Sequence, residues 1–160
     1  MSDRCFAGKA IDKSGPALVD LLRNSPKFET LISAAFVVPD EKSQIEAILK
    51  DWCDQKHVDV ILTTGGTGFA PRDVTPEATR AVLDYKAPGI STAMMKSSLD
   101  ITPMAMLSRS VCGVRGRTLI VNLPGSPKGA VENATTALIG IPHAVSLIRG
   151  DLENVEKVFL

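Results

Sequence analysis

Apolar residues recur along the chain at spacings that predict alternating helices and strands. Between Ile45 and Cys53 they fall at helical intervals, which is the stripe of an amphipathic helix. Shorter stripes predict further helices at residues 15–22, from 76 to about 85, from about 128 and at 143–149, with a weak or frayed helix in the tail at 151–160. Runs rich in β-branched residues predict strands at 32–38 and 58–64, and a short hairpin of 111–114 with 118–122.

This alternation is typical of the α/β class. We expect a single three-layer domain over residues 1–160, with a mostly parallel sheet and helices on both faces. A chain of 160 residues can bury one sizeable core. In such sheets the loops after neighbouring strands share one edge, where ligands bind. The loops that follow the strands at 58–64 and 118–122 are therefore expected to lie together.

Composition narrows the functional classes. The chain has 18 basic and 18 acidic residues, so it lacks the positive field that broad nucleic-acid binding requires. We see no apolar run long enough to cross a bilayer and no signal-peptide stretch at the start, and we expect a cytoplasmic protein. The three cysteines are odd in number and widely spaced, which favours reduced structural thiols.

A glycine-rich loop carries the clearest chemical signal. The predicted strand at 58–64 runs into Gly65-Gly66-Thr67-Gly68, where the backbone can turn tightly and its amides can face an anion. Thr75 is expected to cap the next helix and Pro76 to occupy its first position, which would bring the positive helix end to the same loop. The spacing matches neither a Walker loop nor the dinucleotide fingerprint. We interpret the loop as a phosphate site, with an ordinary turn as the alternative.

Methionines gather in the middle of the chain. Met94, Met95, Met104 and Met106 lie between residues 90 and 110. Because methionine is flexible and polarisable, such a segment favours a buried or adaptable apolar surface, and an oligomer interface is the next interpretation.

Several dispersed motifs occur in a single order: 12–15 (DKSG), 37–40 (VVPD), the string 63–79, 88–89 (PG), 102–103 (TP), 106–109 (MLSR) and 119–125 (LIVNLPG). Together they resemble the molybdopterin adenylyltransferase family, which includes the G domain of gephyrin. The resemblance runs from about residue 2 to about residue 149. It implies a Mg²⁺-dependent transfer of AMP from ATP to the terminal phosphate of molybdopterin, with release of pyrophosphate, during molybdenum cofactor biosynthesis.

The resemblance also assigns residues. It implies that Asp40 and Asp73 are an essential acidic pair at the metal and ATP, and that Ser108 serves the pterin site and turnover. Mg²⁺ favours carboxylates and phosphate oxygens, which suits such a pair. The residues expected to bind ATP or molybdopterin are Asp12, Ser14, Gly15, Gly65, Gly66, Thr67, Gly68, Asn122, Pro124 and Gly125.

Simpler interpretations stand beside these roles. Asp40 and Asp73 would be ordinary turn residues without the family context, and Ser14 with Gly15 could equally form a helix cap. Arg72 and Arg109 are weaker candidates for balancing charge.

The resemblance further implies a homotrimer and a possible molybdenum insertase partner. The alternative to an enzyme is a non-catalytic molybdopterin-binding or trimerising scaffold module. Family members carry an apolar strand before the segment that matches Ser2 and Asp3, whereas this sequence begins at Met1. An unpaired strand edge and exposed apolar surface are therefore expected.

Overall fold

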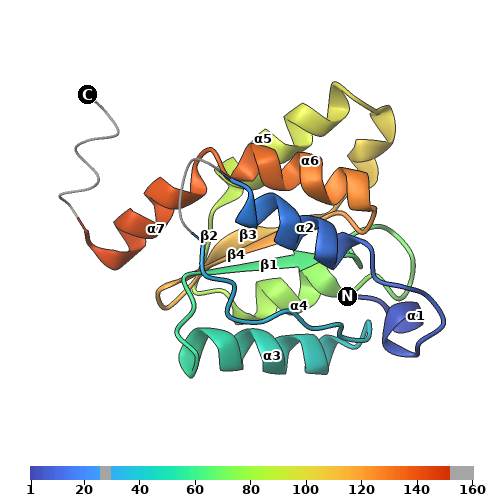
Figure 1. The fold of residues 1–160 in the computed structure, drawn as a ribbon, viewed down its shortest axis with the longest axis horizontal. Coiled ribbons are helices and arrows are strands. Elements are labelled where there is room, and N and C mark those ends of the chain that lie inside the picture. Colours follow the sequence, from blue (N-terminus) through green and yellow to red (C-terminus); the bar gives the residue numbers. More distant parts are fainter. Residues whose placement is uncertain (26–29, 152–160) are drawn as a thin grey trace.

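A mixed sheet forms the middle layer of the structure, a computed structural model that describes residues 1–25 and 30–151 (Figure 1). Its strands are β1 (Val60–Thr64), β2 (Tyr85–Lys86), β3 (Cys112–Arg115) and β4 (Thr118–Leu123), in the order β1-β4-β3-β2. The β1–β4 pairing is parallel, and the β3–β4 and β2–β3 pairings are antiparallel. The α/β class is confirmed, but the sheet is mixed rather than mostly parallel because the β3–β4 hairpin reverses the chain.

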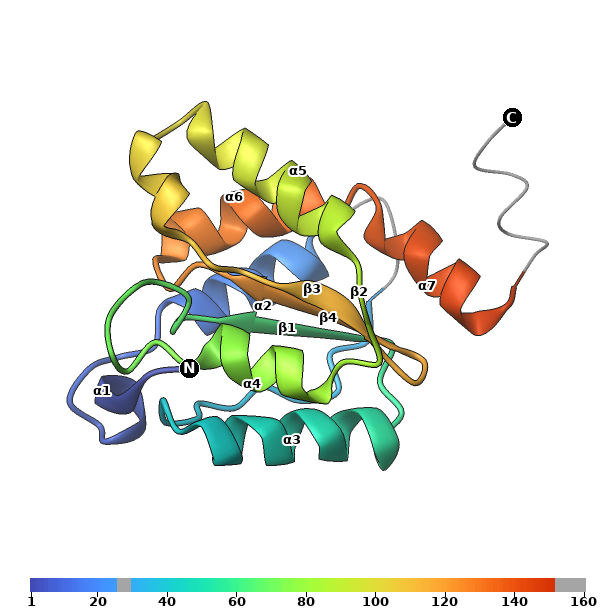
Figure 2. The same ribbon diagram turned by 180° about the vertical axis from the view of Figure 1, so that it is seen from behind.

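Helices cover both faces of this sheet, as predicted (Figures 1 and 2). One face carries α2 (Ser14–Arg23), α5 (Pro88–Leu99), α6 (Pro127–Ala137) and α7 (Ile141–Arg149), and the other carries α3 (Lys42–Asp54) and α4 (Thr75–Val82). Strand β4 is buried throughout and separates two cores, because successive side chains alternate between its faces. Leu119 and Val121 pack with the first set of helices, and Ile120 packs with the second.

Two short helical turns lie beside the carboxyl end of β1. Helix α1 (Asp3–Phe6) follows the first residues of the chain, and the Met1 amino group donates to the Thr64 carbonyl at the end of β1. The 3₁₀ turn η1 (Pro103–Leu107) leads into Arg109, whose backbone amide donates to the Thr67 carbonyl at 2.8 Å. Both turns therefore flank the glycine loop.

The predicted helices at 15–22, 45–53, 76–85, 128 onward and 143–149 are all present as α2, α3, α4, α6 and α7. Helix α3 buries Ile45, Leu49 and Cys53, the stripe that the sequence predicted. Helix α5 and the two-residue strand β2 were not predicted. The tail prediction for 151–160 falls almost entirely outside the described residues.

The predicted strand at 32–38 is wrong. These residues run without regular secondary structure. Phe36, within the segment, is 70% exposed, and Leu31, directly before it, is 89% exposed. Strand propensity needs a partner with which to form a ladder, whereas this segment is tied to the start of the chain by a bond from the Ser2 amide to the Val38 carbonyl at 2.9 Å. β1 accordingly has β4 as its one ladder partner within the described part of the chain.

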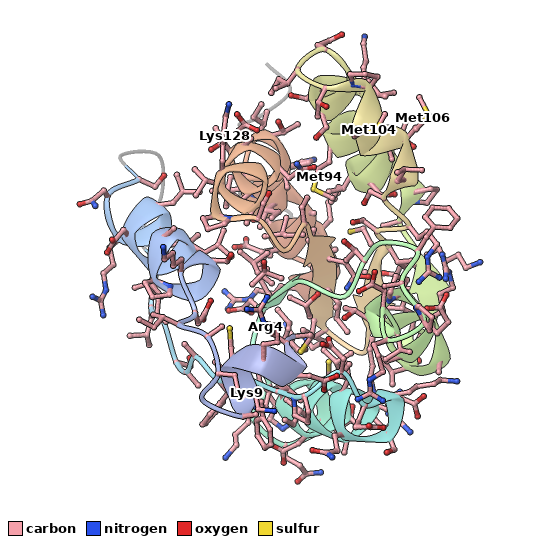
Figure 3. All side chains as sticks on the ribbon, turned by 90° about the vertical axis from the view of Figure 1, so that its right-hand side faces the viewer. Arg4, Lys9, Met94, Met104, Met106 and Lys128 are labelled. Atoms are coloured by element: carbon pink, nitrogen blue, oxygen red, sulfur yellow. The ribbon has the colours of Figure 1, made fainter. Side chains whose placement is uncertain are left out.

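The methionines divide between core and surface. Met94 on α5 is 2% exposed and packs in the first core, whereas Met104 and Met106 on η1 are 61% and 60% exposed. Figure 3 shows Met94 directed toward α6 and Met106 directed away from the molecule. Within residues 1–25 and 30–151, no helix is both long and apolar enough to cross a membrane.

Candidate active site

The loops after β1 and β4 meet at one edge of the sheet, as the sequence predicted. The strands end in register, with Thr64 opposite Leu123, and the Gly65 amide donates to the Leu123 carbonyl at 3.2 Å. The Thr64 hydroxyl donates to the Pro124 carbonyl at 2.6 Å. A Cβ placed on Gly125 would lie 3.1 Å from the Gly65 Cα, so the two loops are in direct backbone contact.

The first loop takes a conformation that requires glycine. Gly65 and Gly66 have φ values of 91° and 63°, in the left-handed region that other residues rarely adopt. A Cβ on Gly66 would lie 2.5 Å from the Thr75 hydroxyl oxygen and 3.0 Å from Asp40 Oδ1. Because Gly66 has no Cβ, its backbone can approach one oxygen from α4 and one from the segment before α3 more closely than another residue could.

Asp40 has one oxygen that is buried without a partner. Its Oδ1 atom lacks a hydrogen-bond partner within the described residues, whereas Oδ2 accepts from the Asp3 amide at 2.9 Å. The Asp40 amide in turn donates to Asp3 Oδ1 at 2.9 Å. An unpartnered buried carboxylate oxygen is costly, so Oδ1 is available to a cation or a donor from a ligand.

Arg72 compensates the charge beside Asp40. Its guanidinium binds both carboxylate oxygens of Asp3, at 2.9 and 3.1 Å, and Glu41 at 2.7 Å. The hydrogen bonds from Arg72, followed by the backbone bond with Asp40, hold the pKa of Asp3 below its usual range. Asp3 is therefore a carboxylate that fixes the orientation of Asp40, a role that the sequence did not reveal.

Asp73 lies at the far end of the same loop. Its Oδ2 atom accepts from the Ala70 amide at 3.0 Å and would be 2.8 Å from a Cβ on Gly68. The Asp73 amide donates to the Ala70 carbonyl at 2.8 Å. Asp40 thus faces Gly66, and Asp73 faces Gly68 of the same loop. Asp73 also closes the turn that connects this loop to α4.

Thr75 is not the helix cap that the sequence predicted. Helix α4 begins at Thr75 itself, with Val74 in the cap position and Pro76 second. The Thr75 amide donates to the Gly66 carbonyl at 3.1 Å, while its fully buried hydroxyl has no partner within the described residues. The prediction failed because Thr75 is itself the first residue of the helix and its amide already has an acceptor, the Gly66 carbonyl. Its hydroxyl lies beside Gly66 and caps no helical amide.

Asn122 ties the site to the core. Its side chain is fully buried, accepts from the Val111 amide at 3.2 Å and donates to the hydroxyls of Thr63 and Thr79, each at 2.9 Å. These bonds join β4, β1, α4 and the segment that carries Ser108. Asn122 is therefore placed to position both loops from within rather than to touch a ligand through its side chain.

The start of α2 is capped by Asp12. Asp12 Oδ1 accepts from the amides of Ser14 and Gly15 at 3.0 and 3.1 Å. The Ser14 hydroxyl donates to the Gly125 carbonyl at 2.9 Å, which attaches this helix to the second loop. Ser14 and Gly15 are thus the first residues of α2 rather than its cap, and it is Asp12 that accepts from their amides. Phosphate binding by Ser14 and Gly15 stays a prediction.

Ser108 ends η1 beside the glycine loop. Its hydroxyl lies 2.9 Å from that of Ser110, and the next residue, Arg109, contacts the loop directly. The carbonyl of the buried Thr67 accepts a hydrogen bond from the Arg109 amide. The structure thus places Ser108 at the same edge as the two glycine loops. Pro124 joins this edge through its carbonyl.

The residues at this edge fit a Mg²⁺ ion that also binds phosphate oxygens. Within the described residues, no three histidine, cysteine or acidic side chains cluster as a metal site. Mg²⁺ does not need such a cage, because it is commonly held by one or two carboxylates together with substrate phosphates and water. The Asp40 Oδ1 atom, which has no partner within the described residues, supplies a carboxylate oxygen of that kind beside the backbone of Gly66. The backbone amides of the loop suit the phosphates.

Comparisons with known proteins agree with this geometry. A family described as "Probable molybdopterin binding domain" matches residues 1–143. The chain is 49% identical to gephyrin from Dictyostelium discoideum over 92% of its own length, but it spans only 21% of that relative. It is 40% identical to the molybdopterin adenylyltransferase of Helicobacter pylori strain J99, covering 98% of this chain and 88% of the relative.

A solved structure has the same fold. The molybdopterin biosynthesis enzyme MoaB from Thermus thermophilus superposes with a TM-score of 0.86 at 50% identity, covering 93% of this chain and 92% of that one. With the family match over most of the sequence, this chain belongs to the family of probable molybdopterin binding domains.

Proposed function

We propose that this chain is a molybdopterin adenylyltransferase that transfers AMP from ATP to the terminal phosphate of molybdopterin. The observation that carries the proposal is the buried, unpartnered Asp40 Oδ1 atom in front of Gly66, at the edge where two glycine loops meet. The Helicobacter pylori relative, which is named for this activity, aligns over nearly the whole chain.

The transfer joins two anions. An oxygen of the terminal pterin phosphate attacks the α-phosphorus of ATP, a new P–O bond forms, and the bond to the β-phosphate breaks so that pyrophosphate leaves with the electron pair. Such chemistry depends on positioning and charge neutralisation more than on covalent help from the protein. In this assignment, loop amides at Gly66 and Gly68 orient the nucleotide phosphates, while the Gly65 amide stays on the Leu123 carbonyl and holds the loop against β4. The second loop at Pro124 and Gly125 borders the same ligand.

Asp40 and Asp73 are the residues that would hold Mg²⁺. When bound, Mg²⁺ would supply positive charge that offsets the charge of the phosphates. Asp3 keeps Asp40 oriented, and Arg72 offsets the negative charge of Asp3 and Glu41. The Asp73 carboxylate is held in its turn by the hydrogen bond from the Ala70 amide.

The pterin is assigned to the side of the loop that carries Ser108. Its hydroxyl can donate to or accept from a phosphate or a pterin group after exchanging its contact with Ser110. Asp12 would reach the substrate only by releasing the amides of Ser14 and Gly15.

Assembly and location extend the proposal. We assign a homotrimer whose interface includes the exposed Met104 and Met106, since exposed methionine gives an adaptable apolar surface. We also place the reaction in the cytoplasm, with the adenylylated product passing to a molybdenum insertase. The three cysteines are all free thiols, which suits a reducing compartment.

The direct test incubates the purified chain with molybdopterin, ATP and Mg²⁺ and follows adenylylated molybdopterin and pyrophosphate by mass spectrometry. Asp40→Asn and Asp73→Asn should each lower the rate by about 100-fold while the protein stays folded. Asp54→Asn is the control, because Asp54 binds Arg115 from the carboxyl end of α3, whereas Asp40 precedes the start of that helix. Normal turnover by either site variant would contradict the metal assignment.

Ser108→Ala tests the pterin side. It should slow transfer or product release without changing the melting temperature, whereas Ser91→Ala on α5, whose hydroxyl donates to the Pro88 carbonyl, should leave both unchanged. If folded wild-type protein binds both ligands and forms no product, the chain is a non-catalytic binding module instead.

A further inference from the structure

Arg109 contacts the carboxyl end of the glycine loop and the turn that follows it. Its backbone amide donates to the Thr67 carbonyl at 2.8 Å, and its Nε atom donates to the Gly68 carbonyl at 2.7 Å. Its Nη2 atom donates to the Asp73 carbonyl at 2.5 Å. One residue therefore bridges the end of the glycine loop and the turn that carries the Asp73 carboxylate.

The same side chain is anchored on two further groups. Nη1 of Arg109 donates to Glu77 in the first turn of α4, and the guanidinium carbon lies 5.8 Å from the centre of the Phe69 ring. Burial alone would raise the pKa of Glu77, but the hydrogen bond from Arg109 and the backbone bond bring it below its usual range. Glu77 is thus charged at neutral pH and holds Arg109 in place.

These contacts change the role of Arg109. Each of its three guanidinium nitrogens has an acceptor within the protein, so the side chain is occupied by the loop and α4. Arginine presents its donors in a rigid planar fork, whereas lysine is a point charge on a flexible stem. Only the fork can reach the Gly68 carbonyl, the Asp73 carbonyl and Glu77 at once.

We propose that Arg109 is a positioning residue that sets the conformation of loop 67–73, and so fixes the Asp73 carboxylate relative to the loop amides. Because Arg109 follows Ser108 directly, it also couples the segment assigned to the pterin to the loop assigned to ATP. This catalytic consequence rests on the proposed adenylyltransferase function, but the effect on the loop does not.

Arg115 provides a matched control. Its side chain is 25% exposed, against 27% for Arg109, and it also donates to a carboxylate and a backbone carbonyl, those of Asp54 and Val82. It ends β3 at the opposite edge of the sheet from the glycine loops. Arg115→Lys and Arg109→Lys therefore remove similar contacts in different places.

The primary experiment is hydrogen exchange measured on peptides that cover residues 65–75. Arg109→Lys should speed exchange in these peptides by about tenfold, the effect of losing one hydrogen bond to a charged group, and Arg115→Lys should leave them unchanged. Equal exchange in Arg109→Lys and wild type, or equal acceleration by both variants, would overturn the proposal. If Arg109→Lys fails to fold, Glu77→Ala takes its place, since it removes the anchor of Arg109 while leaving both carbonyl contacts.

Kinetics then separate positioning from overall stability. In the adenylation assay Arg109→Lys should lower kcat/KM by about tenfold or more, with kcat falling, while Arg115→Lys loses stability only. If Arg109→Lys speeds hydrogen exchange in the loop but leaves kcat/KM unchanged, the proposed effect of Arg109 on catalysis is overturned. A wild-type protein that forms no product would refute the proposed function, and the exchange experiment would still decide whether Arg109 holds the loop.

Discussion

Gly125 lies against Gly65, so closely that a Cβ on Gly125 would stand 3.1 Å from the Gly65 Cα. The contact joins the loops that leave two parallel strands, and it explains how segments far apart in the sequence form one edge. The backbone of Gly125 does not have a positive φ, so a side chain there is limited by space alone.

Gly125→Ala should therefore separate the two loops by a few tenths of an ångström. We expect kcat/KM for adenylation to fall about tenfold because small displacements at a reacting centre are costly. The free energy of unfolding should change by less than about 1 kcal/mol. Gly140→Ala is the control, since a Cβ there meets nothing within 4 Å and its φ is negative. Equal kinetics in the two variants would show that the contact is unimportant.

Thr75 and Thr79 give a second, internally controlled test. Both are fully buried in α4, but the Thr75 hydroxyl has no partner among the described residues, whereas that of Thr79 accepts from Asn122. Thr75→Val should keep or raise the free energy of unfolding by about 1 kcal/mol and weaken ATP binding in the presence of Mg²⁺. Thr79→Val should lower the free energy of unfolding by about 1–3 kcal/mol.

Calorimetry and urea unfolding distinguish these outcomes. If Thr75→Val binds ATP and Mg²⁺ as tightly as wild type does, the hydroxyl in front of Gly66 is not part of the ligand site. If Thr75→Val loses as much stability as Thr79→Val, the hydroxyl has a partner that its geometry does not reveal.

Asn122→Leu should be severely destabilising despite the similar volume. It leaves the buried Val111 amide without its acceptor and removes the donor of Thr63 and Thr79. We expect a loss of about 3 kcal/mol in urea unfolding. Asn24→Leu is the control because Asn24 is exposed and its side chain donates to the Asp20 carbonyl one turn earlier. A loss no greater than that of the control would show that the buried network is dispensable.

Cys112 predicts a stability change at alkaline pH. Burial raises the pKa of this thiol to about 12, so it stays neutral in the folded protein when an unfolded thiol would ionise. Because the folded pKa is the higher one, stability is complete below the unfolded pKa and falls as pH rises toward 12, by about 1.4 kcal/mol per pH unit. Unfolding measured in this window should show a shallower pH slope for Cys112→Ala than for wild type. Identical slopes would exclude Cys112 as the cause.

Much of the fold followed from local pattern. The helix at 45–53 could be predicted because its apolar stripe faces one core, and Ile45, Leu49 and Cys53 are indeed buried. The strand at 32–38 could not be judged locally, since a strand exists only with a partner in the sheet. Likewise, the predicted hairpin already implied that β3 runs antiparallel to β4. The prediction of a mostly parallel sheet did not take this reversal into account.

The candidate site divides in the same way. The meeting of the two glycine loops followed from the rule that neighbouring parallel strands end at one edge. The reciprocal bonds of Asp3 with Asp40, and the contact of Arg109 with Gly68, depend on which donor finds which acceptor after folding. No spacing in the sequence specifies such long-range partners.

The carboxylate of Asp12 gives the site a preference that the glycine loops alone would lack. By occupying the amides of Ser14 and Gly15, it places a fixed negative charge on the positive end of α2, a helix that would otherwise attract phosphate. A polyphosphate arriving at this edge would thus be repelled from the start of α2 and left with the backbone amides of the glycine loop. The protein would thereby select the orientation of a nucleotide by excluding the wrong anion position, before any contact with its base.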